Sequence, residues 1–425
     1  MALLNPPADV IAVRRELHAT PELGFLEFRT AAKVAAVLDS LGYGLELGEA
    51  AMSAAERMGL PSAETLDREF EAAAAEMPGE RRFIERFRGG MTAMVATLDG
   101  DRSGGVAAFR FDMDALPVTE SDSPDHLPNR EGFRSQRAGL MHACGHDGHV
   151  AIGLALAARL ADRDFPGQVK LLFQPAEEGL RGAASVVASG VLDRVDRITC
   201  MHLGLGLPTG IVHGSTEGLS ASSKKRAIFT GRAAHAGMDP ENGANALLAA
   251  AGAVVRLHAL PQYAGDGSRL NVGTFTSGSA PNIVAERAEL TLETRALDSV
   301  TECRLAEAAE STVRAAGAGL GVEVSIESIG GAPEVVCDGT AAERVLEAAA
   351  AVDGLVPTAG PHRDSGSEDA SWLLERVREG GGDGTYVAFG CSSPSGHHSS
   401  TFDLDEAALP MAVDLLEGVA RAGVS

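Results

Sequence analysis

The chain has 425 residues, of which 45% are hydrophobic and 22% are charged, so it can bury a large core and form two or three domains. Its net charge of -23 excludes a broad nucleic-acid surface, because phosphate binding needs clustered Lys and Arg. The five scattered cysteines do not form a disulfide framework pattern, and no apolar run reaches the roughly 18 residues of a membrane span. We therefore expect a cytoplasmic globular protein without nucleic-acid or membrane partners.

The first half of the chain alternates strand and helix patterns. Residues 48–90 are rich in Ala, Glu and Arg and predict a helical insertion, while residues 106–111, 169–173 and 197–201 read as buried strands. Each strand is followed by acidic or metal-ligating residues, namely Asp112 and Asp114, then Glu177 and Glu178, then His202. This alternation predicts an α/β fold with a mostly parallel sheet that gathers these side chains at its carboxyl edge.

A second pattern begins near residue 222. Strand and helix patterns follow in the order β-α-β-β-α-β up to about residue 330, which is the split βαβ arrangement of a small α+β domain. The α/β pattern then returns. We therefore predict one domain made of residues 1–221 and 331–425, with residues 222–330 inserted into it as a second domain.

The segment 142–149 concentrates three histidines, one cysteine and one aspartate. Cys144 and His146 stand two residues apart, so a loop can direct both side chains to one point. A thiolate and an imidazole together suit a borderline-soft divalent cation such as zinc or manganese. The segment therefore predicts a metal site.

Adjacent carboxylates after a strand, such as Glu177 and Glu178, point in different directions. One can bind a cation, while the other takes a proton from a metal-activated water and passes it to a leaving amine. Two points stay open at this stage. Either residue of the pair 397–398 can point inward, and either Asp112 or Asp114 can accept the second ring N–H of a metal-bound histidine, with the other capping a helix.

These residues resemble the M20 metallopeptidase/amidohydrolase family, in particular its aminoacylase-like subgroup of N-acyl amino acid hydrolases. The matching motifs follow one another along almost the whole chain, at residues 112–117, 142–149, 174–179, 201–202, 235–237 and 398–402. The resemblance implies a zinc-peptidase-like α/β domain with an inserted, ferredoxin-like α+β lid that mediates dimerisation. It also implies one or two divalent ions, Mn or Zn, for each copy of the chain.

The resemblance assigns a role to each matching residue. The metal ligands would be Cys144, His146, Glu178, His202 and His398. The catalytic set would be Glu177 as general base and then acid, Asp114, and His235, which reaches across the dimer to the oxyanion. Asn282 and Arg295 would contact the substrate carboxylate, and the planar fork of an arginine suits that task. The family's peptidase branches carry Asp where this chain has Cys144.

The expected function is therefore metal-dependent hydrolysis of the amide bond of an N-acyl or N-aroyl amino acid, with an acidic amino acid as the amine product. Conjugates of the p-aminobenzoyl-glutamate type are the expected substrates. The alternatives are an indole-acetyl-amino acid hydrolase, a dipeptidase or carbamoylase of the same fold, or a subunit that is inactive until a related chain joins it in a hetero-oligomer.

Overall fold

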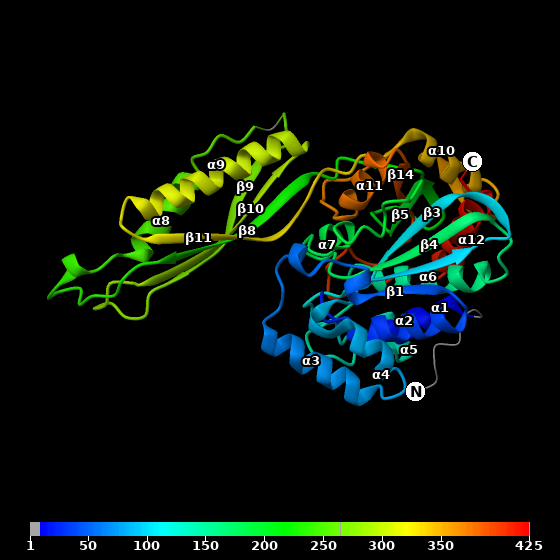
Figure 1. The fold of residues 1–425 in the computed structure, drawn as a ribbon, viewed down its shortest axis with the longest axis horizontal. Helices are drawn as coiled ribbons and strands as arrows, with labels where there is room; N and C mark the ends of the chain where they lie inside the picture. Colours follow the sequence, from blue (N-terminus) through cyan, green and yellow to red (C-terminus); the bar gives the residue numbers. More distant parts are fainter. Residues whose placement is uncertain (1–8, 264, 425) are drawn as a thin grey trace. The chain divides into compact units, whose positions relative to one another are not determined.

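The computed structural model describes residues 9–263 and 265–424, so the outermost ends of the predicted domains lie outside the described residues. The chain forms two compact units (Figure 1). The first runs to Glu217, resumes at Val335–Asp364 and continues from Asp369. The second comprises Gly218–Glu334 together with Ser365–Glu368.

An eight-stranded sheet forms the centre of the first unit, in the order β1-β2-β4-β3-β5-β14-β6-β12. Its middle strands β4, β3, β5 and β14 are parallel to one another, whereas β1 and β2 run antiparallel at one edge. The strands are β1 (Gly44–Leu47), β2 (Met94–Asp99), β3 (Arg102–Asp112), β4 (Pro166–Gln174), β5 (Arg197–Leu203), β6 (Ile211–His213), β12 (Val356–Thr358) and β14 (Asp383–Phe389). The predicted α/β class is confirmed, and β5 is buried at every position, as expected of a strand covered on both faces.

Helices surround this sheet. They are α1 (Val10–His18), α2 (Phe28–Ser40), α5 (Leu127–Glu131), α6 (His146–Leu160), α7 (Ala183–Val187), α10 (Gly339–Ala349), α11 (Ala370–Glu379) and α12 (Ala408–Ala422). The apolar helix α6 packs against β3, α1 and α12. It begins directly at the predicted metal segment, where Gly145 takes a left-handed conformation with φ of 90°. This turn directs the side chains before and after it toward the carboxyl ends of the strands.

Residues 48–90 form five short helical elements in the first unit. They are η1 (Gly48–Ala50), η2 (Ala54–Glu56), α3 (Ala63–Glu76), α4 (Arg81–Ile84) and η3 (Glu85–Gly90). The segment packs on α2, where the rings of Phe28 and Phe70 meet edge to face at 5.7 Å. The buried aromatic contact anchors the segment to the main body of the unit.

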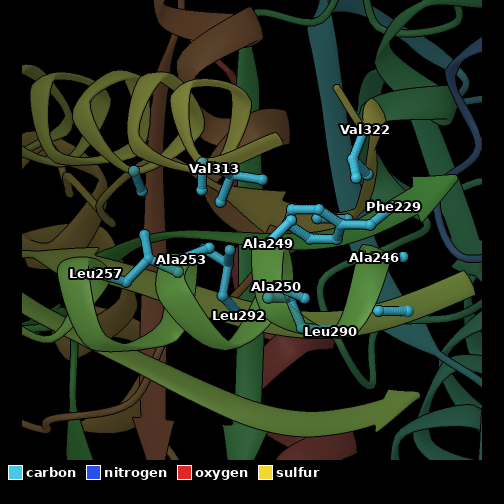
Figure 2. Close-up of a cluster of buried hydrophobic side chains, with 14 of the residues drawn as sticks. Phe229, Ala246, Ala249, Ala250, Ala253, Leu257, Leu290, Leu292, Val313 and Val322 are labelled. Atoms are coloured by element: carbon cyan, nitrogen blue, oxygen red, sulfur yellow. The ribbon is translucent and has the colours of Figure 1, made fainter. Parts of the chain in front are cut away.

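The second unit follows the order β8 (Ala221–Thr230), α8 (Ala246–Leu257), β9 (Arg269–Ser277), β10 (Arg287–Ala296), α9 (Ser299–Ala318) and β11 (Glu323–Ala332). Its antiparallel sheet has the order β11-β8-β10-β9, which is the ferredoxin-like arrangement. Both helices pack on one face of the sheet around Phe229, Leu290, Leu292 and Val313 (Figure 2). Alternate residues of β10 are buried, so the sheet has one apolar face and one polar face.

Candidate metal centre

The five residues predicted as metal ligands lie together at the carboxyl edge of the large sheet. Ligand atoms of Cys144, His146 and Glu178 all lie within 4.8 Å of one another. The Sγ of Cys144 lies 3.5 Å from Nε2 of His202, and Nε2 of His398 lies 3.3 Å from Oε1 of Glu178. The chain therefore brings sulfur, nitrogen and oxygen donors from four separate segments to one place, and their binding of a metal stays a prediction.

His146 gives the clearest test of whether a cation fits this cluster. Its Nδ1 donates to the backbone oxygen of Asp114 at 2.8 Å, so the lone pair is on Nε2. That Nε2 is fully buried and has no hydrogen-bond partner among the described residues, while carboxylate oxygens of Asp112 and Glu177 lie 3.6 and 3.9 Å away. A buried lone pair that faces carboxylates and a thiol is unfavourable by itself. A divalent cation would satisfy all these groups at once.

The peptide of Leu203 orients several of the surrounding histidines. Its oxygen accepts hydrogen bonds from Nδ1 of His202 at 2.8 Å and from Nε2 of His397 at 3.1 Å. Its N–H donates to Nε2 of His149 at 3.1 Å, and Nδ1 of His149 donates to Asp112 at 2.5 Å. Because carbonyl oxygens only accept, His202 carries its proton on Nδ1 and presents the Nε2 lone pair to Cys144.

Burial and the neighbouring histidines also set the charge of these rings. Burial first, and then the nearby imidazoles of His149 and His397, hold the pKa of His202 well below its ordinary value. His202 is therefore neutral at physiological pH, which is the form that binds a metal. Burial would lower the pKa of His146 too, but the carboxylate of Asp112 outweighs that effect and raises it, so this environment favours a positive charge on Nε2, either a proton or a metal cation in its place. The same negative field attracts a cation.

The loop that carries Glu177 and Glu178 is held by Asp114. The two carboxylate oxygens of Asp114 accept the successive backbone N–H groups of Glu177 and Glu178, each at 3.0 Å. The Glu177 side chain is buried, with 8% of its surface exposed, and lies beside the donor cluster. The ring N–H of His146 donates to the main-chain oxygen of Asp114, so Asp114 supports the loop of Glu177 and a predicted ligand at the same time.

Three supporting residues were given no role of their own in the sequence analysis, although His149 belongs to the segment 142–149 and His397 to the pair that was left open there. Arg110 is fully buried and donates to Asp112 at 2.5 Å, and Asp112 in turn holds His149. His397 joins Cys144 and His202 in a second group of ligand atoms within 4.8 Å of one another. The spacing carried a signal for two of them, because Arg110 shares a strand face with Asp112, and His149 lies one helical turn after His146. The role of His397 depends on a backbone carbonyl and has no such signal.

The predicted residues of the second unit divide into two groups. His235 and Asn282 are exposed neighbours, because the oxygen of Asn282 accepts the N–H of Ala236 at 3.0 Å. Arg295 lies elsewhere on the same unit, opposite Ser222, whereas Arg287 at the other end of β10 pairs with Thr230. Eight residues of strand separate these ends, which corresponds to about 26 Å. Arg295 is bound to Glu293 at 2.9 Å.

Residues 108–422 match Peptidase family M20/M25/M40. The chain belongs to this family. It is 43% identical to one subunit of the p-aminobenzoyl-glutamate hydrolase of Escherichia coli (strain K12), over 95% of this chain and 93% of the relative. It is 44% identical to the indole-3-acetyl-aspartic acid hydrolase of Enterobacter agglomerans, over the same shares of both chains.

Two solved structures extend the comparison. An aminobenzoyl-glutamate utilization protein from Klebsiella pneumoniae matches with a TM-score of 0.82 and 38% identity, over 97% of this chain and 95% of that one. A Bacillus subtilis protein described as a dinuclear metal binding peptidase of the M20 family matches with a TM-score of 0.66 and 25% identity, over 97% of both chains.

The predicted resemblance to the M20 family is thus confirmed. The sequence also predicts, from the insertion at 48–90 and the segments 89–92, 109–112 and 366–370, a resemblance to the p-aminobenzoyl-glutamate hydrolase chain, and the 43% identity to that relative over 95% of this chain supports it. Family membership and the donor cluster together make the protein a hydrolase of amide C–N bonds that uses a divalent metal.

Proposed function

We propose that the protein hydrolyses the amide bond of N-aroyl or N-acyl conjugates of acidic amino acids, with p-aminobenzoyl-glutamate as the representative substrate. The observation that carries this proposal is the buried carboxylate of Glu177 beside the cluster of five side chains that we predict to bind a metal. The two relatives above 40% identity support the substrate class, because each is named for an amide conjugate of glutamate or aspartate.

We assign the metal to Cys144, His146, Glu178, His202 and His398, as one or two ions of manganese or zinc. When bound, such an ion polarises a carbonyl oxygen and lowers the pKa of a water molecule. Glu177 takes the proton of the attacking water on a carboxylate oxygen. It then delivers this proton to the amine nitrogen as the C–N bond breaks. Asp114 keeps Glu177 and Glu178 in place through their backbone N–H groups.

His235 is suited to donate a hydrogen bond to the oxyanion. Its Nδ1 accepts the backbone N–H groups of Gly237 and Met238, at 3.2 and 3.1 Å, so the proton is on Nε2. We assign Asn282 and Arg295 to the substrate carboxylate. His235 pairs with Ile283, just before β10 begins, and about 26 Å of this strand separate its first residue from Arg295. We therefore propose that the two ends of one lid serve different active sites of a dimer.

The second unit also offers a surface for dimerisation. Strand β9 is an edge of the sheet, and Phe275 on it is 41% exposed. Leu248 and Val255 lie two turns apart on one face of α8 and are 54% and 73% exposed. We propose that this edge and helix pair with a second copy, so that residues 222–330 act as lid and dimerisation domain of the catalytic domain formed by 1–221 and 331–425.

Three further proposals concern a second substrate, a partner chain and the location of the enzyme. The 44% identity to an indole-3-acetyl-aspartic acid hydrolase supports the indole-acetyl conjugate as a second candidate substrate. The Escherichia coli relative is named as one subunit of its enzyme, which supports a hetero-oligomer with a related chain as the alternative to a homodimer. We further propose a cytoplasmic location, because the odd number of scattered cysteines fits a reducing compartment. No helix among residues 9–263 and 265–424 is long and apolar enough to cross a membrane.

The test is an assay of the purified protein, stripped with a chelator and reloaded separately with manganese, zinc, cobalt or nickel. The substrates are p-aminobenzoyl-glutamate, indole-acetyl-aspartate, N-acetyl-alanine and a dipeptide. We expect metal-dependent release of the acidic amino acid, at a higher kcat/KM than for the neutral substrates. Hydrolysis of the dipeptide or of N-acetyl-alanine at an equal or higher kcat/KM would contradict the proposed substrate class. Lack of hydrolysis with every metal would contradict an enzyme that is active by itself.

A further inference from the structure

The loop with Glu177 and Glu178 has a backbone that other parts of the molecule must hold in place. Ala176 and Leu180 adopt left-handed conformations, with φ of 53° and 64°, although neither is glycine. A residue other than glycine is strained in this conformation, which persists only where the surroundings fix it. The direction of both glutamate side chains depends on this conformation, so whatever holds the loop also sets the site.

Two buried carboxylates accept hydrogen bonds from the backbone of this loop. Glu27 accepts the N–H of Ala176 at 2.9 Å, and Asp114 accepts the next two N–H groups along the chain. Both carboxylates are buried, with Glu27 at 0% exposure. Three consecutive N–H groups are therefore directed at two acids. Glu27 matches none of the motifs that predicted the site, and it lies 149 residues before the alanine that it holds.

The segment 48–92, which is the helical insertion and the two residues after it, is linked to this loop directly through Arg181, and indirectly through Glu27 and through helix α7, which follows the loop. Thr92 donates its hydroxyl to the second oxygen of Glu27 at 2.7 Å. The guanidinium of Arg181 donates to the carbonyl of Glu178 at 2.8 Å and to the carbonyl of Gly59 at 3.1 Å. The N–H of Ser53 donates to the carbonyl of Ser185 at 2.7 Å.

We propose that the segment 48–92 is a brace that fixes the catalytic loop, with Glu27, Thr92 and Arg181 as positioning residues. Arg181 bridges the loop and the brace through two carbonyl oxygens, and Thr92 holds the carboxylate that binds Ala176. Displacement of a reacting group by about 1 Å can cost roughly 100-fold in rate, so loss of the brace weakens both proton transfer and metal binding. The inference rests on the proposed roles of Glu177 and Glu178.

Arg181→Met tests the bridge, with Arg57→Met as its matched control. Arg57 is also a half-buried arginine that donates to a main-chain oxygen, that of Gly89, but this bond lies within the insertion. For Arg181→Met we expect faster amide hydrogen exchange at residues 176–181, metal affinity lower by about 10-fold and kcat lower by about 100-fold. Arg57→Met should leave all three close to wild type.

Glu27 allows a second test that separates positioning from folding. Glu27→Gln keeps an oxygen that accepts the N–H of Ala176, and its amide N–H can donate to the Thr92 hydroxyl with the direction of that bond reversed. Glu27→Leu keeps the size of the side chain and loses both bonds. We expect Gln to preserve exchange protection and metal affinity, and Leu to lose both while the far-UV spectrum stays native. Thr92→Ser keeps the hydroxyl and should behave like Glu27→Gln, whereas Thr92→Val loses the hydroxyl and should behave like Glu27→Leu.

Unchanged amide exchange and metal affinity in both Arg181→Met and Glu27→Leu would overturn the brace. These two readouts need no substrate. Failure of the proposed substrate therefore leaves them unaffected, and failure of the brace leaves the substrate assay of the wild-type enzyme unaffected.

Discussion

Most of the groups assigned to chemistry in the first unit are buried and hydrogen-bonded, although Glu178 is only partly buried and His398 is exposed, whereas those of the second unit are exposed. Cys144, His146 and His202 are at most 8% exposed, and hydrogen bonds fix the two histidine rings. In the second unit His235 and Asn282 lie on the surface, and backbone N–H groups define only the tautomer of His235. We therefore expect the buried part of the metal site to be prebuilt, and we expect a ligand or a second copy of the chain to order the exposed groups of the second unit.

Glu177→Ala should give the largest effect, because it removes the proposed proton shuttle from the prebuilt site. We expect kcat to fall by at least about 1,000-fold. Metal content should stay at the wild-type level, because this carboxylate is left off the ion, and elemental analysis of the dialysed protein measures it. Glu178→Ala is the comparison variant and should lose the metal. Activity of more than a few per cent in Glu177→Ala would refute the shuttle.

His235→Ala tests the role of the exposed groups of the second unit. Loss of a single oxyanion donor lowers kcat by about 100- to 1,000-fold, so we expect a decrease in that range. Metal affinity should not change, because no predicted metal ligand belongs to the second unit. Steady-state kinetics and a chelator competition measure the two quantities. A parallel fall in metal affinity would show that the second unit also contributes to metal binding, which would contradict the assignment of this role to the first unit alone.

Leu290→Ala tests whether the two units can be perturbed separately. Leu290 is fully buried in the core of the second unit, and truncation of such a leucine costs about 2 to 5 kcal/mol. We expect this unit to unfold at a lower temperature, as measured by calorimetry. Metal affinity at room temperature should remain that of the wild type. Weakened metal binding in the folded variant would count against separate units.

The last expected effect concerns the pH dependence of stability rather than activity. Burial, and then the nearby carboxylate of Asp114, raises the pKa of Glu27 to about 8. An unfolded glutamate has a pKa of about 4.3, so the folded state retains this proton to higher pH. The resulting stability is fully present below about pH 4 and is lost as the pH rises through about 8. Glu27→Gln has no proton to lose.

Urea unfolding of the wild type and of Glu27→Gln at several pH values between about 5 and 9 measures this difference. The free energy of unfolding of the wild type should fall relative to that of the variant as the pH rises. A constant difference between the two proteins across this range would show that Glu27 does not titrate as described.

Much of this architecture was predictable because it follows from local patterns. Buried apolar runs that end at Asp112, Glu177 and His202 predict parallel strands with ligands at one edge, and the structure brings these side chains together there. The split βαβ order of the second unit follows in the same way from strand and helix periodicity. The resemblance to the M20 motifs also names the residue types that a metal needs, so the five ligands could be predicted from the sequence alone.

The supporting contacts were not predictable, because they join main-chain groups across long sequence distances. Leu203 acts through its peptide, so its side-chain identity carries no signal. Glu27 and Arg181 act on the loop through N–H and carbonyl groups of Ala176, Glu178 and Gly59. Such residues resemble ordinary charged positions until the fold brings them beside the loop.

The most direct test of the account is a crystal structure of the manganese- or zinc-loaded enzyme, with anomalous scattering recorded at the metal's absorption edge. The account predicts an anomalous peak bonded to Cys144, His146, Glu178, His202 and His398, with the Glu177 carboxylate beside the ion but not bound to it. A peak at another place, or five donors spread apart with no ion between them, would contradict it.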